Sequence, residues 1–553
     1  MGQQMGWGSR ALSKARSTTC VAAKPRLRLL GWMILAGIGA CGRRVERCLR
    51  CDTLVIAAAG EPDALLPPVI GTTVGRDISD LIFERLANLS GGGSPIDSSA
   101  YRAGLASRWE RIDSVTLRFH LRPGAHWHDG VAVTSQDVVF SFEAYADSVL
   151  DASSRDLLAG RVVASALDDS TVDIRFREPD PEQWYDATWH VRVLPRHIWF
   201  PVPTSAWASD TSSDRLIGSG PFRLGARSAA QSLTLERADS SLSTGEIRRV
   251  VWRFSEDQDA ALNLLLSHEA DLLESVGDSS RAARVTADSA LRVVTYPSAI
   301  YGFLGFNLGR GTASKARDVR RALAQAIDRA TAARAVLGPG ATAPPGPMSR
   351  LLWILEDSIA VLPYDTAAAA GAFDRAGWPR GNDGVRRRSG RALTVDILVP
   401  ATSNARRNLA QVLQEMWRAA GVRAEITSVD MPVFQQRLRT GAFDSYIGAW
   451  LDEPSPRSLA DQWTAAGIGN LNYSKYRSVR FDSLFRRAAS TRSSAAEARR
   501  AWREAIDTLN ADAPGIWLYT PMNAAGVARR IEGFSIDPYS WLSTLPSWRL
   551  SAP

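Results

Sequence analysis

The chain has 553 residues, 45% of them hydrophobic and 22% charged, which is the composition of an ordinary globular protein too long for one hydrophobic core. Two or three domains are therefore expected. The formal charge of +8 does not indicate nucleic-acid binding, because residues 1–50 hold ten Lys and Arg against one acidic residue and the rest of the chain is close to neutral.

The first fifty residues have the layout of an export signal. A basic stretch at 24–28 precedes the apolar run Leu29–Ile38, which is too short to span a bilayer stably, and small residues follow up to Cys41. The sequence IGAC at 38–41 resembles a bacterial lipobox, which implies cleavage before Cys41 and diacylation of its thiol. We expect residues 1–40 to be a signal and 41–52 the tether of a lipid anchor. A plain secretory signal cut near Ala40 is the alternative.

Cysteine usage agrees with export. After Cys41 only Cys48 and Cys51 remain, and the 502 residues that follow contain none. Cys48 and Cys51 have CxxC spacing, which occurs in redox and metal sites, but no second CxxC and no nearby His pair completes such a site. We expect a small disulfide loop or two unused thiols in the tether.

Strand and helix patterns alternate through the first half of the folded chain. An amphipathic helix is expected where Ile78, Leu81, Ile82, Leu86 and Leu89 share one face, closed by the glycines at 91–93. A second helix opens with Thr134 as N-cap and Asp137 at its third position. A third helix is expected at 257–267. Strands are expected from Thr53 and at 114–121, 171–176, 232–236 and 249–254.

The second half has longer helices between apolar strands. We expect strands at 301–308, 393–400, 423–430, 443–450 and 515–521, and helices at 319–337, 408–422, 432–441 and 495–511. This alternation predicts βαβ units and an α/β fold. Ligands bind such sheets at the carboxyl ends of strands, so the loops after Pro400 and Trp450 are the first candidates for a binding site.

Several segments resemble one known family. The stretch from Leu105 to Tyr145 follows the signature of the family 5 extracellular solute-binding proteins, the dipeptide, oligopeptide and nickel receptors of ABC importers. The sequences at 194–199, 217–224, 306–329 and 533–541 agree with it in the family's order. The resemblance implies a two-lobed periplasmic binding protein-like fold of class II type with an extra inserted domain. Its expected parts are lobe I (53–84, 217–296 and 523–553), an inserted domain (85–216) and lobe II (297–522).

The same resemblance implies an extracytoplasmic substrate-binding lipoprotein of an ABC importer. It would enclose a peptide or similar small solute between its lobes and deliver it to a permease and ATPase complex in the membrane. We expect a monomer with no cofactor, no catalytic residue and no nucleic-acid partner, since no GxSxG, HExxH or phosphate-loop motif is present. A lipoprotein that uses the same cleft for signalling is the alternative, and an envelope hydrolase is a third possibility.

Resemblance to the peptide-binding members points to the loop after Trp450 as the ligand loop. It suggests that Asp452 pairs with the substrate's α-ammonium group, with Trp450 as a flat apolar wall. The loop is about three residues shorter than in those members, so Glu453 is the rival for this role. Alternatively, Asp452 holds the loop itself as a capping carboxylate.

Asn404, in the NARR sequence at 404–407, and Tyr301, in the first strand of lobe II, are further candidate ligand contacts. Dipeptide receptors carry an Arg-x-Tyr clamp for the substrate carboxylate shortly before the NARR sequence. Here Val399 and Ala401 stand at those positions, which argues against a strict dipeptide receptor. Four tryptophans near lobe II loops are further candidates to line the cleft: Trp353, Trp378, Trp450 and Trp463.

Two other motifs suggest chemistry but are better explained as turns. In HWHDG, His126 and His128 beside Asp129 could hold a metal, yet a chain reversal at Asp129-Gly130 over a packed Trp127 is the expected structure, and no metal site is predicted. The GSGP sequence at 218–221 lacks the Lys-Ser/Thr of a phosphate loop and is expected to be a tight turn.

Overall fold

The computed structural model describes residues 52–238, 245–492 and 494–551. The expected signal, the acylation site Cys41 and the pair Cys48 and Cys51 lie outside the described residues. The chain divides into a unit Met1–Arg47 and a unit Cys48–Pro553, and only the second has described residues. Among the helices described, none combines the length and apolar character needed to cross a membrane.

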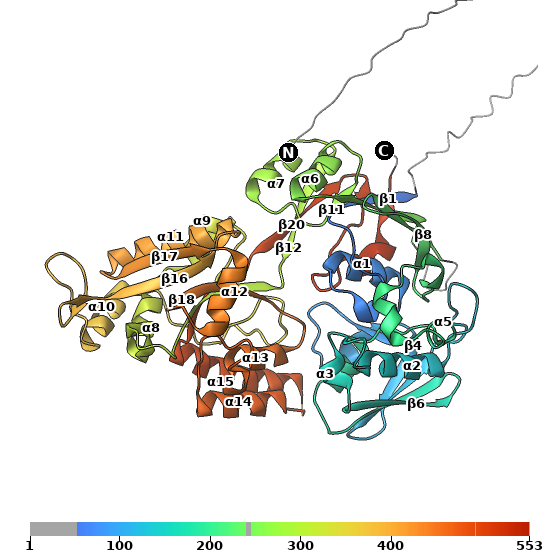
Figure 1. Ribbon diagram of the computed structural model, residues 1–553, viewed down its shortest axis with the longest axis horizontal. Coiled ribbons are helices and arrows are strands. Elements are labelled where there is room, and N and C mark those ends of the chain that lie inside the picture. The colour runs from blue at the N-terminus through green and yellow to red at the C-terminus, as the bar shows by residue number, and fades with distance from the viewer. Residues whose placement is uncertain (1–51, 239–244, 493, 552–553) are drawn as a thin grey trace, which may run out of the picture. The chain divides into compact units, whose positions relative to one another are not determined.

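Lobe I is built on a seven-stranded mixed sheet in the order β12-β20-β11-β1-β10-β9-β8. Strand β1 runs parallel to both β10 and β11, whereas the other pairs are antiparallel. Figure 1 shows that strands from both ends of the described chain, the blue β1 and the red β20, belong to this one layer. The strands are β1 Thr53–Ala59, β8 Phe222–Ser228, β9 Ser232–Arg237, β10 Arg249–Ser255, β11 Leu272–Leu273, β12 Leu291–Pro297 and β20 Met522–Ala528.

Helices cover both faces of this sheet because side chains alternate along β1. Val55 and Ala57 face the helices α6 Gln258–Leu266 and α7 Ser279–Thr286. Leu54 and Ile56 face α1 Thr73–Ile82 and the 3-10 segment Trp541–Ser547. A strand buried on both sides reads as a continuous apolar run, which explains why TLVIAAA was recognisable as a strand.

The inserted domain is a four-stranded antiparallel sheet in the order β4-β5-β7-β6 with α2 packed on it. The predicted start of α2 is confirmed: Thr134 and Asp137 form a reciprocal capping box, and Asp137 also accepts the N–H of Arg196 at 2.8 Å. The elements of this region are β2 Ala87–Leu89, β3 Tyr101–Ala103, β4 Ala106–Arg111, β5 Thr116–Leu121, α2 Ser135–Ala146, α3 Arg155–Leu158, β6 Val162–Asp168, β7 Thr171–Phe176, α4 Gln183–Thr188 and α5 Arg196–Trp199.

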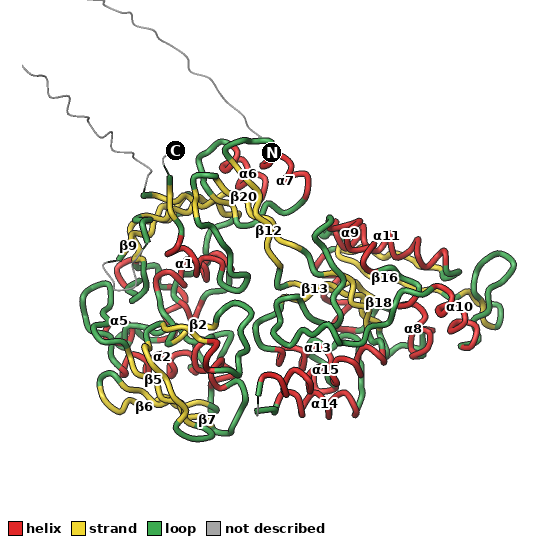
Figure 2. The backbone as a smooth tube through the Cα atoms, turned by 180° about the vertical axis from the view of Figure 1, so that it is seen from behind, coloured by secondary structure: helices red, strands yellow, loops and turns green. Residues whose placement is uncertain are grey.

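Lobe II holds a five-stranded sheet in the order β17-β16-β18-β13-β19. Strand β13 is antiparallel to both of its neighbours, while β16 runs parallel to β17 and β18. Figure 2 shows β12 of lobe I leading toward β13. The strands are β13 Ile300–Phe306, β16 Thr394–Pro400, β17 Arg423–Val429, β18 Ser445–Leu451 and β19 Gly515–Tyr519, and β14 Arg387–Arg388 pairs with β15 Arg391–Ala392.

Each face of the lobe II sheet has its own hydrophobic core. On β13, Leu304 and Phe306 enter one core and Tyr301 and Phe303 the other. The first core is covered by α8 Arg317–Gln325, α9 Arg329–Leu337, α10 Thr366–Arg375 and α11 Asn404–Ala419. The second is covered by α12 Met431–Thr440, α13 Leu459–Trp463, α14 Val479–Ala489 and α15 Ala495–Asp512.

Three predicted helix boundaries were wrong. The helix expected to reach Leu89 ends at Ile82, because Phe83 is extended and Gly220 donates its N–H to the Ile82 carbonyl at 2.8 Å. The helix expected at 319–337 is two helices, since the side chain of Asp328 caps the second one. The helix expected from 408 begins at Asn404, because Ser403 provides the N-cap.

The lobes share little apolar contact. The core of lobe I runs on into the inserted domain, whereas both lobe II cores consist of residues 301–519, with Ile96 packed at the rim of one. The chain passes from β12 to β13 around Ser298 and from β19 to β20 around Pro521, where Ser298 donates its N–H to the Pro521 carbonyl at 3.3 Å. We keep the division into lobe I, inserted domain and lobe II as a proposal. The proposed division implies that the lobes can move relative to each other. Linked domains without a large apolar interface usually do so.

Candidate functional site: a ligand cleft

The HWHDG and GSGP motifs form one structural clamp. His128 accepts the N–H of Gly218 on Nδ1 at 3.2 Å, so its Nε2 carries the proton and donates to the Gly220 carbonyl at 3.0 Å. Burial lowers the pKa of His128, which keeps the ring neutral. Trp127 packs beneath the turn as expected. In the described part of the chain no group of three His, Cys, Asp or Glu side chains could hold a metal.

The loop after β18 places its two acidic residues differently. Asp452 is buried, with 3% of its surface exposed, and its backbone N–H donates to the Ala299 carbonyl at 2.7 Å. Its carboxylate accepts the backbone N–H of Ser349. Asp452 is thus held at the start of β13, close to where the chain passes between the lobes.

Asp452 is an uncompensated acid. Burial raises its pKa to about 7, and the Ser349 hydrogen bonds lower it only in part. Within the described residues it makes no ion pair, and the other groups that act on it are the hydroxyls of Tyr301 and Tyr539. A buried carboxylate without a cation is costly, and it becomes favourable when a cation arrives.

Glu453 faces solvent, although the surrounding protein still raises its pKa. Arg76 of α1 and Arg457 act in the opposite direction. A carboxylate with water on one side and protein on the other is exposed to solvent and is also partly desolvated, which raises its pKa. Because Arg76 belongs to lobe I, Glu453 marks a point where lobe II comes close to it.

None of the predicted ligand contacts, Asp452 and Glu453 included, lines the interlobe pocket described below. Tyr301 is fully buried, and its hydroxyl donates to Gln462. Asn404 is exposed at the first turn of α11, where its side-chain oxygen accepts from Arg407. Trp450 is partly buried and stacks on Tyr473, with 6.4 Å between ring centroids and 15° between planes.

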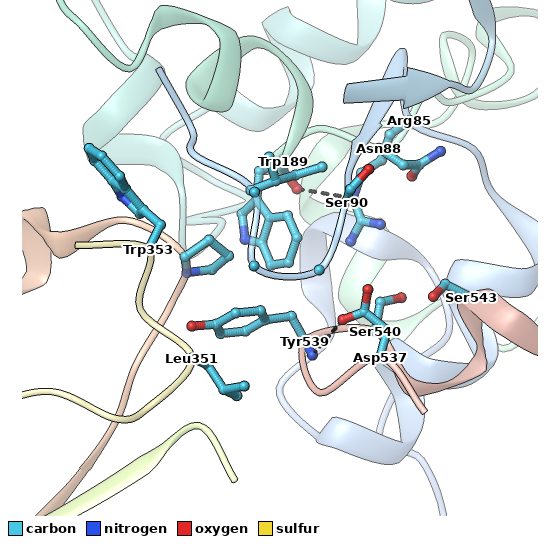
Figure 3. A pocket seen from close by; sticks show the side chains of 15 residues that line it. Arg85, Asn88, Ser90, Trp189, Leu351, Trp353, Asp537, Tyr539, Ser540 and Ser543 are labelled. Atoms are coloured by element: carbon cyan, nitrogen blue, oxygen red, sulfur yellow. Dashed lines mark hydrogen bonds between the residues drawn. The ribbon is translucent and has the colours of Figure 1, made fainter. Parts of the chain in front are cut away.

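One pocket is lined by both lobes, as Figure 3 shows. It contains about 500 Å³ of empty space, open solvent included. Leu351, Trp353 and Pro454 come from lobe II, and the opposite wall comes from the glycine loop 91–93, Trp189 and the segment 537–543. Pro454 belongs to the predicted ligand loop. The loop after Pro400 contributes no lining residue.

Three aromatic side chains, Trp189, Trp353 and Tyr539, line this pocket. Trp189 and Tyr539 meet edge to face, with 6.4 Å between ring centroids, and Trp353 lies on the lobe II side in Figure 3. Trp353 was among the four tryptophans named from sequence, whereas Trp463 is buried in the lobe II core and Trp378 packs at the edge of the other core. Trp189 and Tyr539 were missed, because nothing in their local sequence separates a pocket wall from a core aromatic.

A buried charge cluster supports the pocket wall opposite lobe II. Arg85 donates to the Trp189 carbonyl at 3.1 Å and lies over its ring, 5.1 Å from the centroid. Asp80 pairs with both Arg85 at 3.1 Å and Arg192 at 2.8 Å, and the two guanidinium groups hold the pKa of Asp80 below its usual range despite burial. The cluster thus fixes the orientation of Trp189.

Polar contacts join lobe II to the inserted domain. Arg457 pairs with Glu182 at 2.7 Å, with Asp186 and with Asp180 at 3.5 Å, and Ser455 donates to Glu182. Burial raises the pKa of Glu182 to about 7 although Arg457 opposes the shift. We call Arg457 with these three carboxylates the interlobe ion cluster. It anchors the loop that carries Asp452 and Glu453.

Comparison with known proteins assigns this architecture. Residues 100–470, more than half of the chain, match the family model described as bacterial extracellular solute-binding proteins, family 5 middle. The chain belongs to the family 5 extracellular solute-binding proteins. Members of this family bind solutes outside the cytoplasm and are not enzymes.

Named relatives span nearly the whole chain. The Dipeptide-binding protein of Escherichia coli K12 is 22% identical over 534 residues, covering 92% of this chain and 96% of the relative. The Oligopeptide-binding protein AppA of Bacillus subtilis 168 is 22% identical over 506 residues, covering 90% and 91%.

Solved structures of the family share the fold. AppA from Bacillus subtilis in complex with a nonapeptide aligns with a TM-score of 0.69 at 22% identity, covering 90% of this chain and 99% of AppA. CtaP from Listeria monocytogenes gives 0.78 at 21% identity, and NikZ from Campylobacter jejuni in complex with Ni(L-His) gives 0.71 at 22%, each with the same coverage. The two-lobed binding fold predicted from sequence is thereby confirmed.

Proposed function

We propose that this protein is the substrate-binding lipoprotein of an ABC importer that binds peptides by their amino terminus and delivers them to a membrane permease. The peptide lies between the lobes, its α-ammonium group pairs with Asp452, and closure of the lobes presents the complex to the permease and its ATPase. The protein acts as a monomer and releases the peptide unchanged. The peptide binds the closed state more tightly than the open state, and this difference in affinity drives closure without a chemical reaction.

The single observation that carries this proposal is the buried Asp452 carboxylate without a cation. Its hydrogen bond to Ser349 leaves the negative charge uncompensated, so a ligand ammonium gains a charge-assisted bond in a water-poor site. Two relatives that align along most of the chain carry peptide-binding names, and the AppA structure contains a nonapeptide.

The test compares tetra-alanine with its N-acetyl form by isothermal titration calorimetry. We expect the wild-type protein to bind the free peptide about 100-fold more tightly than the acetylated one, because acetylation removes the charge that Asp452 pairs with. Asp452→Asn removes this discrimination. Asp461→Asn, a neutralised exposed acid on α13, serves as the matched control and leaves it intact.

If Asp452→Asn still distinguishes the two peptides and Glu453→Gln does not, the amine anchor is Glu453. If the wild-type protein binds both peptides equally, or binds neither, recognition of the amino terminus is contradicted.

Lipid anchoring is tested separately at Cys41. We expect the wild-type protein to incorporate labelled palmitate and to sediment with membranes, and Cys41→Ser to do neither. Export of an unlabelled, membrane-free wild-type protein would instead support the plain secretory signal.

A further inference from the structure

A second cavity, separate from the pocket in Figure 3, lies in lobe I. It is formed at the carboxyl ends of the parallel strands β1 and β11, beneath α1. The cavity holds about 520 Å³ of empty space, open solvent included. Its polar lining consists of Asp77, Gln258, Glu274 and Ser275, and its apolar walls include Trp252 and Trp541. Crevices at this edge of an α/β sheet are the usual place for ligands.

Two carboxylates in this cavity lack a counter-ion. Within the described residues neither Asp77 nor Glu274 has an Arg, Lys or His nitrogen within 4 Å. Glu274 accepts a hydrogen bond from the Tyr296 hydroxyl at 3.3 Å, which leaves most of its acceptor capacity free. Burial raises the pKa of both acids. The nearby carboxylates of Glu274 and Asp80 raise the pKa of Asp77 further, because they repel its negative charge.

A buried donor in the same cavity is also unsatisfied. Trp541 is 6% exposed, and its Nε1–H makes no hydrogen bond within the described structure. The group is directed at Asp77, whose pKa it lowers, but the two do not meet as an ordinary hydrogen bond. Buried indole N–H groups normally have an acceptor. The cavity therefore combines two carboxyl groups that lack a counter-ion with one free donor, and a ligand that carries both a cationic group and a separate hydrogen-bond acceptor would satisfy all three.

The cavity borders the ligand cleft. Arg76 acts on both Asp77 of the cavity and Glu453 of the lobe II loop. The segment 537–543 contributes Tyr539 to the pocket in Figure 3 and Trp541 to the cavity, so the two spaces lie on either side of one short stretch of chain. Asp452 in turn acts on Tyr539.

We propose that the cavity lined by Asp77, Glu274 and Trp541 is a subsite for a second positive charge, so that the preferred ligand is a peptide with a lysine or arginine side chain. This inference rests on the proposed function, because it assumes that Asp452 takes the α-ammonium group. The side-chain cation lies between the two carboxylates, and a backbone carbonyl of the same peptide accepts from Trp541. The cleft then contains an anionic site for each of the two charges.

The probes are tetrapeptides of alanine in which lysine occupies each position in turn, together with matched peptides that carry norleucine instead. Norleucine keeps the aliphatic stem and lacks the ammonium group. We expect lysine at one position to strengthen binding to the wild-type protein about 30-fold or more over norleucine, as measured by calorimetry. Arginine at that position gives a similar gain.

The double variant Asp77→Asn/Glu274→Gln removes the gain and leaves norleucine peptides bound as before. Its ligand-free form unfolds at the same or a higher temperature, because two repelling buried charges have been removed, whereas a purely structural role for these acids would lower that temperature. The control double variant Asp156→Asn/Glu415→Gln neutralises two exposed acids outside the cleft and keeps the gain.

Equal affinity for lysine and norleucine peptides at all four positions overturns the subsite while leaving amino-terminal recognition intact. A lysine preference that survives in Asp77→Asn/Glu274→Gln also overturns it. Failure of every free peptide to bind the wild-type protein contradicts the proposed function itself, and so the two failures are distinguishable.

Discussion

At the scale of single residues, the protonation state of Asp452 makes binding depend on pH. Burial raises its pKa from 3.8 to about 7, so the carboxyl is mostly protonated in mildly acidic solution and must lose that proton to pair with an ammonium group. Binding is therefore weak below that pKa and strengthens as pH rises. The facing groups, Ser349, Tyr301 and Tyr539, do not lose a proton in this range.

We predict that the affinity for tetra-alanine rises about tenfold per pH unit between pH ~5 and ~7 and then levels off, until the peptide's own amine, with a pKa of about 8, loses its proton. Calorimetry of Glu182→Gln, in which closure takes up no proton at residue 182, should detect one proton released per peptide at pH 6 in buffers of different ionisation enthalpy. Asp452→Asn should show neither effect. A pH-independent affinity in the wild-type protein would contradict the assignment.

Single residues were predicted correctly from the sequence where their role depends on neighbouring residues, and wrongly where it depends on segments far away in the chain. Thr134 with Asp137 identified a helix start from a pattern of four residues, whereas the ligand loop after Trp450 stays a prediction. Tyr301, by contrast, lies on a strand buried on both faces, and no local pattern tells which of its side chains reach solvent. The burial of Asp452 and Trp541 depends on segments far away in sequence.

At the scale of elements, the clamp between the HWHDG turn and the GSGP loop holds the end of α1. A Cβ added to Gly218 would lie 1.9 Å from the Ile82 carbonyl oxygen, a backbone atom that cannot move aside easily. Only glycine permits this approach. The same contact explains why the predicted helix stopped at Ile82, since the loop that ends it comes from more than a hundred residues later in the chain.

We predict that Gly218→Ala lowers the free energy of unfolding by about 2–3 kcal/mol, as overpacking against a fixed backbone does. Gly311→Ala, at a position with open space around it, is the matched control and should change little. Denaturant titration measures both. Equal stability of the two variants would show that the loop moves to make room.

At the scale of the whole molecule, the interlobe ion cluster is the contact that closure depends on. The cores of the two lobes are separate, so polar contacts such as those of Arg457 carry much of the attachment between lobe II and the inserted domain. Removing Arg457 leaves Glu182, Asp186 and Asp180 facing one another without this cation.

We predict that Arg457→Met opens the lobes, with a loss of about 3 kcal/mol in the closed state. Small-angle X-ray scattering should report a larger radius of gyration than for the wild-type protein at equal peptide concentration. Arg418→Met breaks an exposed pair with Glu415 and should leave the radius unchanged. An unchanged radius in Arg457→Met would show that other contacts hold the lobes.

Glu182 adds a pH dependence to the same contact. In this structure, where Glu182 is buried against Arg457, its pKa is about 7, whereas an exposed glutamate titrates near 4.5, so forming this contact takes up a proton. Burial is the main cause, with Asp186 and Asp180 raising the pKa further and Arg457 and Ser455 lowering it, while the neighbouring His190 stays neutral because burial lowers its pKa to about 3. Scattering should therefore show closure favoured as pH falls from 7 to 5, and Glu182→Gln should remove that trend. Closure that strengthens with rising pH would contradict it.

The fold as a whole was predictable because the family's motifs recur in order along the chain, whereas the cleft was not. Its walls bring together Arg85, Trp189, Trp353 and Tyr539 from four distant segments, and no spacing rule relates them.

Native mass spectrometry of the protein purified without denaturation tests the central claim most directly. We predict a complex heavier than the chain by the mass of an intact peptide with a free amine and a basic side chain, released unchanged on unfolding and absent from Asp452→Asn. A bound solute without any amino group, or the same peptide retained in Asp452→Asn, would contradict the account.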